Sequence, residues 1–112
     1  MKKVVFILSL FLFILANDSY AQAKYWPIEG IWKSNSGNEF YVNYISDYYG
    51  DFIGVKTINT TTKEVIIYEK ITPDYYVATI TTGYLTYKQW LNINSCRSIT
   101  VWTNKSTNSW TR

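Results

Sequence analysis

The sequence predicts an all-β protein, an antiparallel up-and-down β-barrel of about eight short strands, with a β-sandwich as the alternative. Two observations predict this class. Turn-forming residues recur about every eight to twelve positions, a spacing typical of small sandwiches and barrels. The segments between the turns alternate in polarity and are rich in Val, Ile, Thr and Tyr, without useful helical periodicity. A closed barrel is favoured because closure removes the strand edges through which such segments aggregate.

Residues 1–23 are expected to form a secretory signal peptide rather than part of the fold. Two lysines near the start precede an apolar run over residues 4–16, and small residues then allow cleavage after Ala21 or Ala23. The apolar run is too short to span a bilayer comfortably, and an uncleaved N-terminal anchor is the alternative. The domain is therefore expected to cover residues 24–112. The protein is expected to be secreted or periplasmic, with no stable membrane anchor after cleavage.

The turns divide this domain into eight expected strands. In order, they cover residues 28–34, 39–46, 52–59, 64–71, 75–82, 84–93, 98–103 and 109–112. In the first strand, Ile28, Gly30 and Trp32 share one face because side chains alternate along a strand. The second repeats this alternation after a turn of Asn, Ser and Gly. Gly54, inside the third strand, predicts a bulge or a sharp bend of the kind that lets a sheet curl.

The prediction of the later strands depends on their composition and on the turn residues that separate them. The fourth is rich in β-branched residues and stops before Pro73. Gly83 separates the fifth strand from the sixth, whose Tyr, Thr, Trp and Ile content favours a strand over a helix. The seventh and eighth are short and lie on either side of a polar loop at residues 104–108.

Charge and composition exclude several classes of function. The net charge is +3, and removal of the leader leaves nine basic and seven acidic residues, or +2, which is too mild to indicate a nucleic-acid partner. The chain has no histidine, so neither a Ser-His-Asp nor a Cys-His arrangement is possible. Cys96 is the single cysteine, so no intramolecular disulfide can form. Asp47 and Asp51 could share a hard cation, but two carboxylates give too few ligands. We therefore expect no enzyme, no metal site and no cofactor.

Aromatic residues are the most unusual feature of the composition, with five tryptophans and eleven tyrosines. Packing within a sheet explains many of them, because aromatic side chains fill a pleated surface. A tyrosine also offers an apolar face together with a hydroxyl, which suits binding of a sugar ring or a small apolar ligand. The candidate ligand-binding residues are Tyr44, Tyr48, Tyr49, Tyr75, Tyr76, Tyr84 and Tyr87.

The run Gly30-Ile31-Trp32 on the first strand resembles the glycine-x-tryptophan opening of lipocalins, avidins and the small lipocalin-like proteins that bacteria export. The resemblance implies an up-and-down barrel in which a basic residue after the last strand lies over the tryptophan. Arg112 stands in the matching position, so Gly30, Trp32 and Arg112 are the residues expected to close the barrel. A cation over an indole contributes about 0.5 to 2 kcal/mol.

Two hypotheses for function follow. The first is a secreted, non-enzymatic binding protein for a small apolar or sugar-like ligand, with aromatic residues at the open end of the barrel. The second is an envelope or secreted protein-interaction module, an inhibitor or part of an adhesin, that acts through Tyr-rich loops such as residues 47–51. A filled barrel with exposed aromatic residues favours the second hypothesis, and a cavity favours the first.

Overall fold

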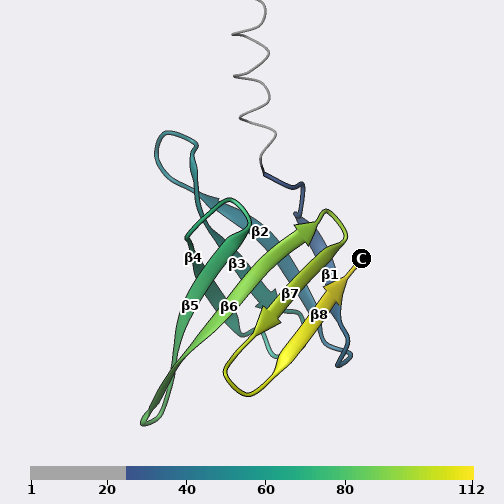
Figure 1. The fold of residues 1–112 in the computed structure, drawn as a ribbon, viewed down its shortest axis with the longest axis vertical. Helices are drawn as coiled ribbons and strands as arrows, with labels where there is room; N and C mark the ends of the chain where they lie inside the picture. The colour runs from purple at the N-terminus through teal and green to yellow at the C-terminus, as the bar shows by residue number, and fades with distance from the viewer. Residues whose placement is uncertain (1–24) are drawn as a thin grey trace, which may run out of the picture.

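The computed structural model describes residues 25–112, which form one closed antiparallel barrel (Figure 1). The strands are β1 (Gly30–Ser34), β2 (Glu39–Ser46), β3 (Phe52–Asn59), β4 (Val65–Lys70), β5 (Tyr75–Thr82), β6 (Leu85–Ser95), β7 (Ser98–Trp102) and β8 (Thr107–Thr111). Each strand pairs with the next along the chain, and β8 pairs with β1. The predicted fold class is confirmed, and the sandwich alternative is excluded. The expected signal peptide, residues 1–23, lies outside the described residues.

Three of the eight strands have the expected bounds, and the other five differ from expectation by one or two residues at one or both ends. The bounds of β2, β3 and β5 are those expected. Strand β6 runs on to Ser95 because its pairing with β7 shifts register between Ile93 and Ser95, and this bulge absorbs Asn94. Strand β1 begins two residues later than expected, at Gly30, whose φ of +130° departs from strand geometry. No helix able to cross a membrane occurs among residues 25–112.

Gly54 marks the bulge that its position predicted. The pairing of β2 with β3 steps from Ile45 opposite Gly54 to Ser46 opposite Phe52, so Ile53 has no opposite residue. A Cβ atom on Gly54 would lie 2.4 Å from the backbone oxygen of Tyr68. Only glycine therefore lets β3 and β4 approach this closely.

The apolar core fills only part of the barrel. Inward-facing side chains of all the strands contribute to it, together with one residue that precedes β1. The buried hydrophobic residues are Ile28, Trp32, Val42, Val55, Tyr68, Tyr76, Ala78, Leu91, Ile93, Ile99, Val101 and Trp110. Tyr68 and Trp110 face inward and also line a hollow at one end of the barrel. The barrel is therefore open at that end and packed at the opposite end.

We name the two ends by their residues. The closed end comprises the segment 25–29, the loops 47–51, 71–74 and 96–97, and Arg112. The open end comprises the loops 35–38, 60–64, 83–84 and 103–106. In Figure 1 the closed end is at the top and the open end at the bottom.

Candidate functional site

Arg112 ties the closed end together. Its guanidinium carbon lies 4.7 Å from the centre of the Trp32 ring, an arrangement that allows a cation–π interaction. Its Nη1 donates to the backbone oxygen of Glu29 at 2.8 Å, and its Nε donates to that of Cys96 at 2.9 Å. Its Nη2 donates to the backbone oxygen of Pro27. One side chain thus joins the segment before β1, the loop after β6 and the end of β8.

Trp32 is wholly buried beneath this arginine. Its indole Nε1 donates to the backbone oxygen of Ile28 at 2.8 Å, so the buried N–H is satisfied. A Cβ on Gly30 would lie 3.4 Å from Nη1 of Arg112, and the positive φ of this residue also favours glycine. Gly30, Trp32 and Arg112 therefore lie together.

Aromatic rings complete the closed end. Tyr44 and Phe52 stack with their centres 4.3 Å apart, and Tyr25 meets both edge-on. Lys70 donates to the Tyr25 hydroxyl at 2.8 Å, and the Tyr44 hydroxyl donates to the backbone oxygen of Trp26 at 2.8 Å. Burial is the main cause that raises the pKa of the Tyr44 hydroxyl above its ordinary value. The segment before β1 therefore covers this end of the barrel.

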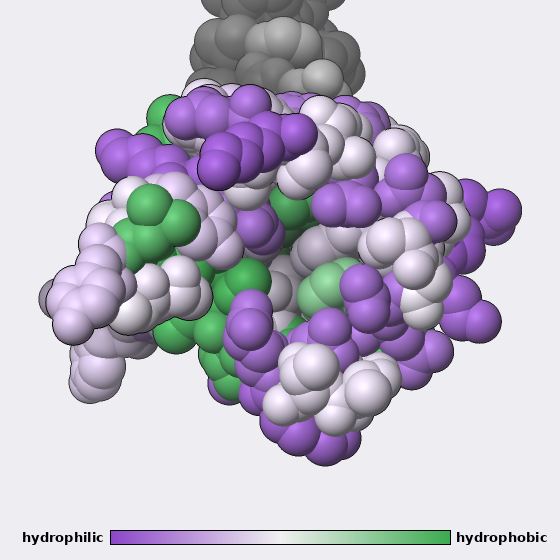
Figure 2. All heavy atoms as spheres, turned by 90° about the horizontal axis from the view of Figure 1, so that it is seen from below, coloured by the Kyte–Doolittle hydropathy of each residue, from purple (hydrophilic) through white to green (hydrophobic). Residues whose placement is uncertain are grey.

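The open end holds a cavity of about 370 Å³. Figure 2 looks onto this end and shows a hollow with hydrophilic side chains around its mouth and hydrophobic atoms inside. The lining residues are Ser34, Ser36, Asn38, Phe40, Asn59, Thr62, Glu64, Ile66, Tyr68, Gln89, Val101, Trp102, Thr103, Ser106, Asn108 and Trp110. They come from seven strands and three loops, so the cavity depends on the closed barrel.

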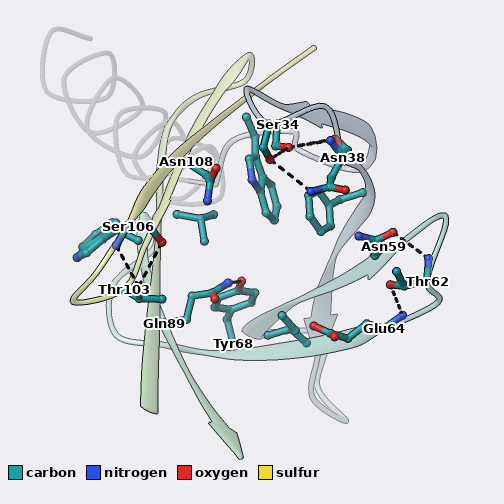
Figure 3. Close-up of a pocket in the computed structure, with 16 residues that line it drawn as sticks. Ser34, Asn38, Asn59, Thr62, Glu64, Tyr68, Gln89, Thr103, Ser106 and Asn108 are labelled. Carbon is teal, nitrogen blue, oxygen red and sulfur yellow. Dashed lines mark hydrogen bonds between the residues drawn. The ribbon is translucent and has the colours of Figure 1, made fainter. Parts of the chain in front are cut away.

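Aromatic rings form one wall and the floor of this cavity. Phe40 and Trp110 stack with ring centres 4.3 Å apart and planes inclined by 11°. The floor holds Tyr68, whose hydroxyl accepts a hydrogen bond from Nε2 of Gln89 at 2.6 Å (Figure 3). Burial raises the pKa of the Tyr68 hydroxyl above its ordinary value, so this group stays protonated and can donate.

The rim consists of hydroxyls and amides that the loops hold in place. Ser34 Oγ lies 2.8 Å from Ser36 Oγ and accepts a hydrogen bond from the backbone N–H of Asn38. Asn59 Oδ1 caps the next loop by accepting two backbone N–H groups, which leaves its amide nitrogen available. Asn108 points into the hollow from β8 (Figure 3). The rim is thus ordered before any ligand arrives.

The cavity is nearly free of charge. Glu64 is the one ionisable acidic side chain among its lining residues, and no Lys or Arg is present. Within residues 25–112, Asn43 Oδ1 is the one buried side-chain polar atom without a hydrogen-bond partner, and Asn43 is not a lining residue. Polar atoms of the cavity that lack a protein partner are therefore open to solvent and to a ligand.

The seven tyrosines singled out from the sequence do not come together, and none lines this cavity. Tyr44 and Tyr76 point inward but lie at the closed end, where the Tyr76 hydroxyl donates to the backbone oxygen of Pro73 at 2.8 Å. Tyr75 is half-buried, with its ring centre 5.9 Å from that of Trp102. These three positions belong to packing around the closed end and the barrel wall.

The other four candidates lie on loops and on a projecting hairpin. Tyr48 and Tyr49 are 95% and 86% exposed in the loop between β2 and β3, at the closed end. Tyr84 is fully exposed in the turn between β5 and β6, and Tyr87 is half-buried on β6 opposite Ile80. The aromatic residues that line the open-end cavity are instead Phe40, Tyr68, Trp102 and Trp110.

The alternation of inward-facing and outward-facing side chains along a strand was the signal that could have identified Tyr68 and Gln89, two cavity residues that were not predicted. Tyr68 follows Ile66 by two positions in β4, and Gln89 precedes buried Leu91 by two in β6. Both therefore face inward. No group of three or more metal-ligating side chains of the usual types occurs among residues 25–112. Comparison with protein-family models, with characterised proteins and with solved structures finds no match to this chain.

Proposed function

We propose that this protein is an exported, non-enzymatic, lipocalin-like binding protein whose open-end cavity takes a small, uncharged, sugar-like ligand. The observation that carries the proposal is the combination of a stacked aromatic wall with a rim of hydroxyls and amides. Sugar rings present an apolar face edged by hydroxyls, which is the complement of such a lining.

The lining also distinguishes between ligand classes. A wholly apolar ligand would cover the hydroxyls and amides of the rim without replacing their hydrogen bonds to water, which is costly. An anionic ligand would meet Glu64 and no cationic side chain. A neutral polyhydroxylated ligand pairs with the rim and stacks on Phe40, so it fits this chemistry best.

The test is a calorimetric titration of the purified protein with neutral mono- and disaccharides, a hexuronic acid and a fatty acid. We expect saturable binding of at least one neutral sugar, weaker binding of the acid and a change in tryptophan fluorescence, because Trp102 and Trp110 line the cavity. The bound sugar should be recovered unchanged after long incubation. Binding of the fatty acid alone, or of nothing in the panel, would overturn the proposal.

A matched pair of variants locates the binding. Asn108→Ala removes an amide from the cavity and should weaken binding about threefold to tenfold, the value of one hydrogen bond. Asn92→Ala removes a half-buried amide that does not line the cavity and donates to Asn94, so it should leave affinity unchanged. Equal effects of the two substitutions would place the ligand elsewhere.

A second candidate function, protein interaction through the loop 47–51, is favoured by its geometry. Oδ1 of Asp47 accepts the backbone N–H groups of Tyr49 and Asp51 at 2.8 and 3.0 Å, so the loop is held in one shape. The loop presents Tyr48 and Tyr49 to solvent with their ring centres 5.4 Å apart. Rigid exposed tyrosines give contact area at low entropic cost.

A pull-down from culture supernatant or envelope extract tests this second candidate. A partner that binds the loop should be lost from the double variant Tyr48→Ser/Tyr49→Ser and kept by Tyr84→Ser, which changes an equally exposed tyrosine at the open end. This candidate function would be excluded if no partner were recovered, or if the partner were lost equally from the double variant and from Tyr84→Ser.

A further inference from the structure

The hairpin of β5 and β6 extends beyond the barrel at the open end (Figure 1). The two strands pair over eight rungs, from Tyr75 opposite Asn92 to Thr82 opposite Leu85. Strand β4, however, pairs with β5 over only two rungs, and β7 reaches β6 no further than Trp90. The outer five rungs, residues 78–82 with 85–89, therefore form a two-stranded arm without a neighbouring strand on either side, and we call them the arm. An isolated hairpin is only marginally stable, so such an arm gains from a partner.

The outward-facing backbone groups of the arm can be assigned from the ladder. Ile93 N donates to Asp74 O at 2.8 Å, so Asp74 and Ile93 form a hydrogen-bonded pair at the end of the ladder between β5 and β6. Hydrogen-bonded and non-hydrogen-bonded pairs alternate along an antiparallel ladder, so the pairs Thr79–Lys88 and Thr81–Thr86 are non-hydrogen-bonded. By that alternation, Thr79 and Thr81 direct their N–H and C=O groups away from β6. Ile71 N donates to Tyr75 O at 2.8 Å, so Tyr75 directs its C=O group away from β6. Thr79 and Thr81 lie an even number of residues beyond Tyr75 and therefore have the same orientation.

A groove lies beside this free edge where β4 and β5 separate. Its volume is about 470 Å³. Its lining residues are Glu64, Val65, Ile66, Ile67, Thr79, Ile80, Thr81, Thr82 and Tyr87. Val65 and Ile67 are 48% and 57% exposed, so the wall opposite the arm also carries uncovered apolar side chains. The space beside β5 is therefore open to another strand.

The two edges of the arm differ in charge. The β5 edge has no charged side chain from Tyr75 to Thr82, whereas the β6 edge carries Lys88. Lysine on an edge strand is a common protection against pairing with another chain, and β5 lacks it. Like charges therefore do not oppose the pairing of two β5 edges.

We propose that two copies of this chain associate by antiparallel pairing of their β5 edges about a two-fold axis at Ile80. In this register Thr79 of each copy lies opposite Thr81 of the other. The outward N–H and C=O groups of both residues then find partners, which gives four backbone hydrogen bonds. The Ile80 side chains meet on the axis. The free edge is thus complementary to itself, and a two-fold contact requires that property. The short ladder implies a weak, concentration-dependent dimer.

Two proline variants of the same rung test this arrangement. Thr81→Pro removes one outward N–H from the β5 edge, and Thr86→Pro removes the corresponding N–H from the β6 edge. Both N–H groups point away from the hairpin, and both variants lose the same Thr81–Thr86 hydroxyl contact of 3.2 Å. In sedimentation velocity at increasing concentration, wild type and Thr86→Pro should reach twice the monomer mass, and Thr81→Pro should stay monomeric. A wild-type protein that stays monomeric at every concentration would overturn the proposal, as would a dimer lost only in Thr86→Pro.

A cysteine variant tests the register without depending on proline. Facing residues of a non-hydrogen-bonded antiparallel pair have Cα atoms about 4.5 Å apart, which is within the range of a disulfide. Ile80→Cys in a Cys96→Ser background should therefore form a covalent dimer under mild oxidation. Tyr87→Cys in the same background places the thiol on the other strand of the same rung and should not. Equal cross-linking of both would overturn the register.

Discussion

The two ends of the barrel are made from the same eight strands and yet differ in how their polar groups are used. At the closed end, the polar side chains bond to the protein itself: Arg112 to three carbonyls and Trp32 to one. At the open end, hydroxyls and amides surround a cavity. The one buried polar side-chain atom without a partner among residues 25–112 lies elsewhere, on Asn43. The closed end is thus suited to stability, and the open end leaves polar groups for a ligand.

What separates the ends is the segment before β1 rather than the strands. Residues 25–29 bring Tyr25 against Tyr44 and Phe52, and they offer carbonyls to Arg112. Among residues 25–112, no equivalent segment covers the open end, which comprises only the short loops 35–38, 60–64, 83–84 and 103–106. Substitutions at the two ends should therefore have different effects.

The largest expected effect on stability is at the closed end. Trp32→Ala would leave a cavity in the core and the backbone oxygen of Ile28 without its indole partner, so we expect unfolding to become easier by about 3 to 5 kcal/mol. Phe40→Ala, at the half-buried wall of the open cavity, should cost less. Urea unfolding followed by circular dichroism measures both. Equal losses would mean that the two ends are packed alike.

A smaller loss of stability is expected from Arg112→Ala. The substitution removes the cation over Trp32 and leaves the carbonyls of Pro27, Glu29 and Cys96 without this donor, and we expect a cost of about 2 kcal/mol. The exposed Arg97 supplies a control of the same residue type on an adjoining loop, and Arg97→Ala should change stability by less than about 0.5 kcal/mol. Similar values for the two variants would mean that Arg112 contributes little to closure.

The last expected change in stability concerns alkaline pH. Burial raises the pKa of Tyr44, Tyr68 and Tyr76 in the folded protein above the ordinary value of 10.0. The folded state then holds protons that the unfolded state releases. Stability from this source is complete below pH 10 and falls as the pH rises further.

The measurement is urea unfolding at a series of pH values, with single Tyr→Phe variants. Tyr44→Phe and Tyr76→Phe remove closed-end hydroxyls, and Tyr68→Phe removes the one at the cavity floor. Each variant should flatten the fall in stability above pH 10. A pH dependence that is the same in all the variants would show that these hydroxyls are not the groups concerned.

Much of the fold could be predicted from the sequence because turns and alternation are local signals. Dense turn residues gave the bounds of β2, β3 and β5, and Gly54 indicated the bulge. Trp32 and Arg112 could be named as neighbours because the run Gly30-Ile31-Trp32 resembles the opening of lipocalins, and that resemblance implies a basic residue after the last strand that lies over the tryptophan. The pairing of β8 with β1 brings these two segments together.

The cavity could not be predicted in the same way. The tyrosines were chosen by residue type, whereas lining the cavity depends on facing inward and on lying at the open end. Tyr76 meets the first condition and not the second, and Tyr68, which meets both, was not singled out. Which end is open depends on how residues 25–29 pack, and no local pattern reveals that. The early separation of β4 from β5 is likewise a tertiary feature, because both segments read as ordinary strands.

The contacts of Arg112 with the segment 25–29 have a practical consequence for handling the molecule. Residue 25 and residue 112 lie at the same pole, opposite the mouth of the hollow (Figure 1). A surface, a resin or a fluorophore linked next to either residue would hold the molecule with its mouth turned towards the bulk solution. Sensor-chip measurements can therefore use either point of attachment without obstructing the cavity.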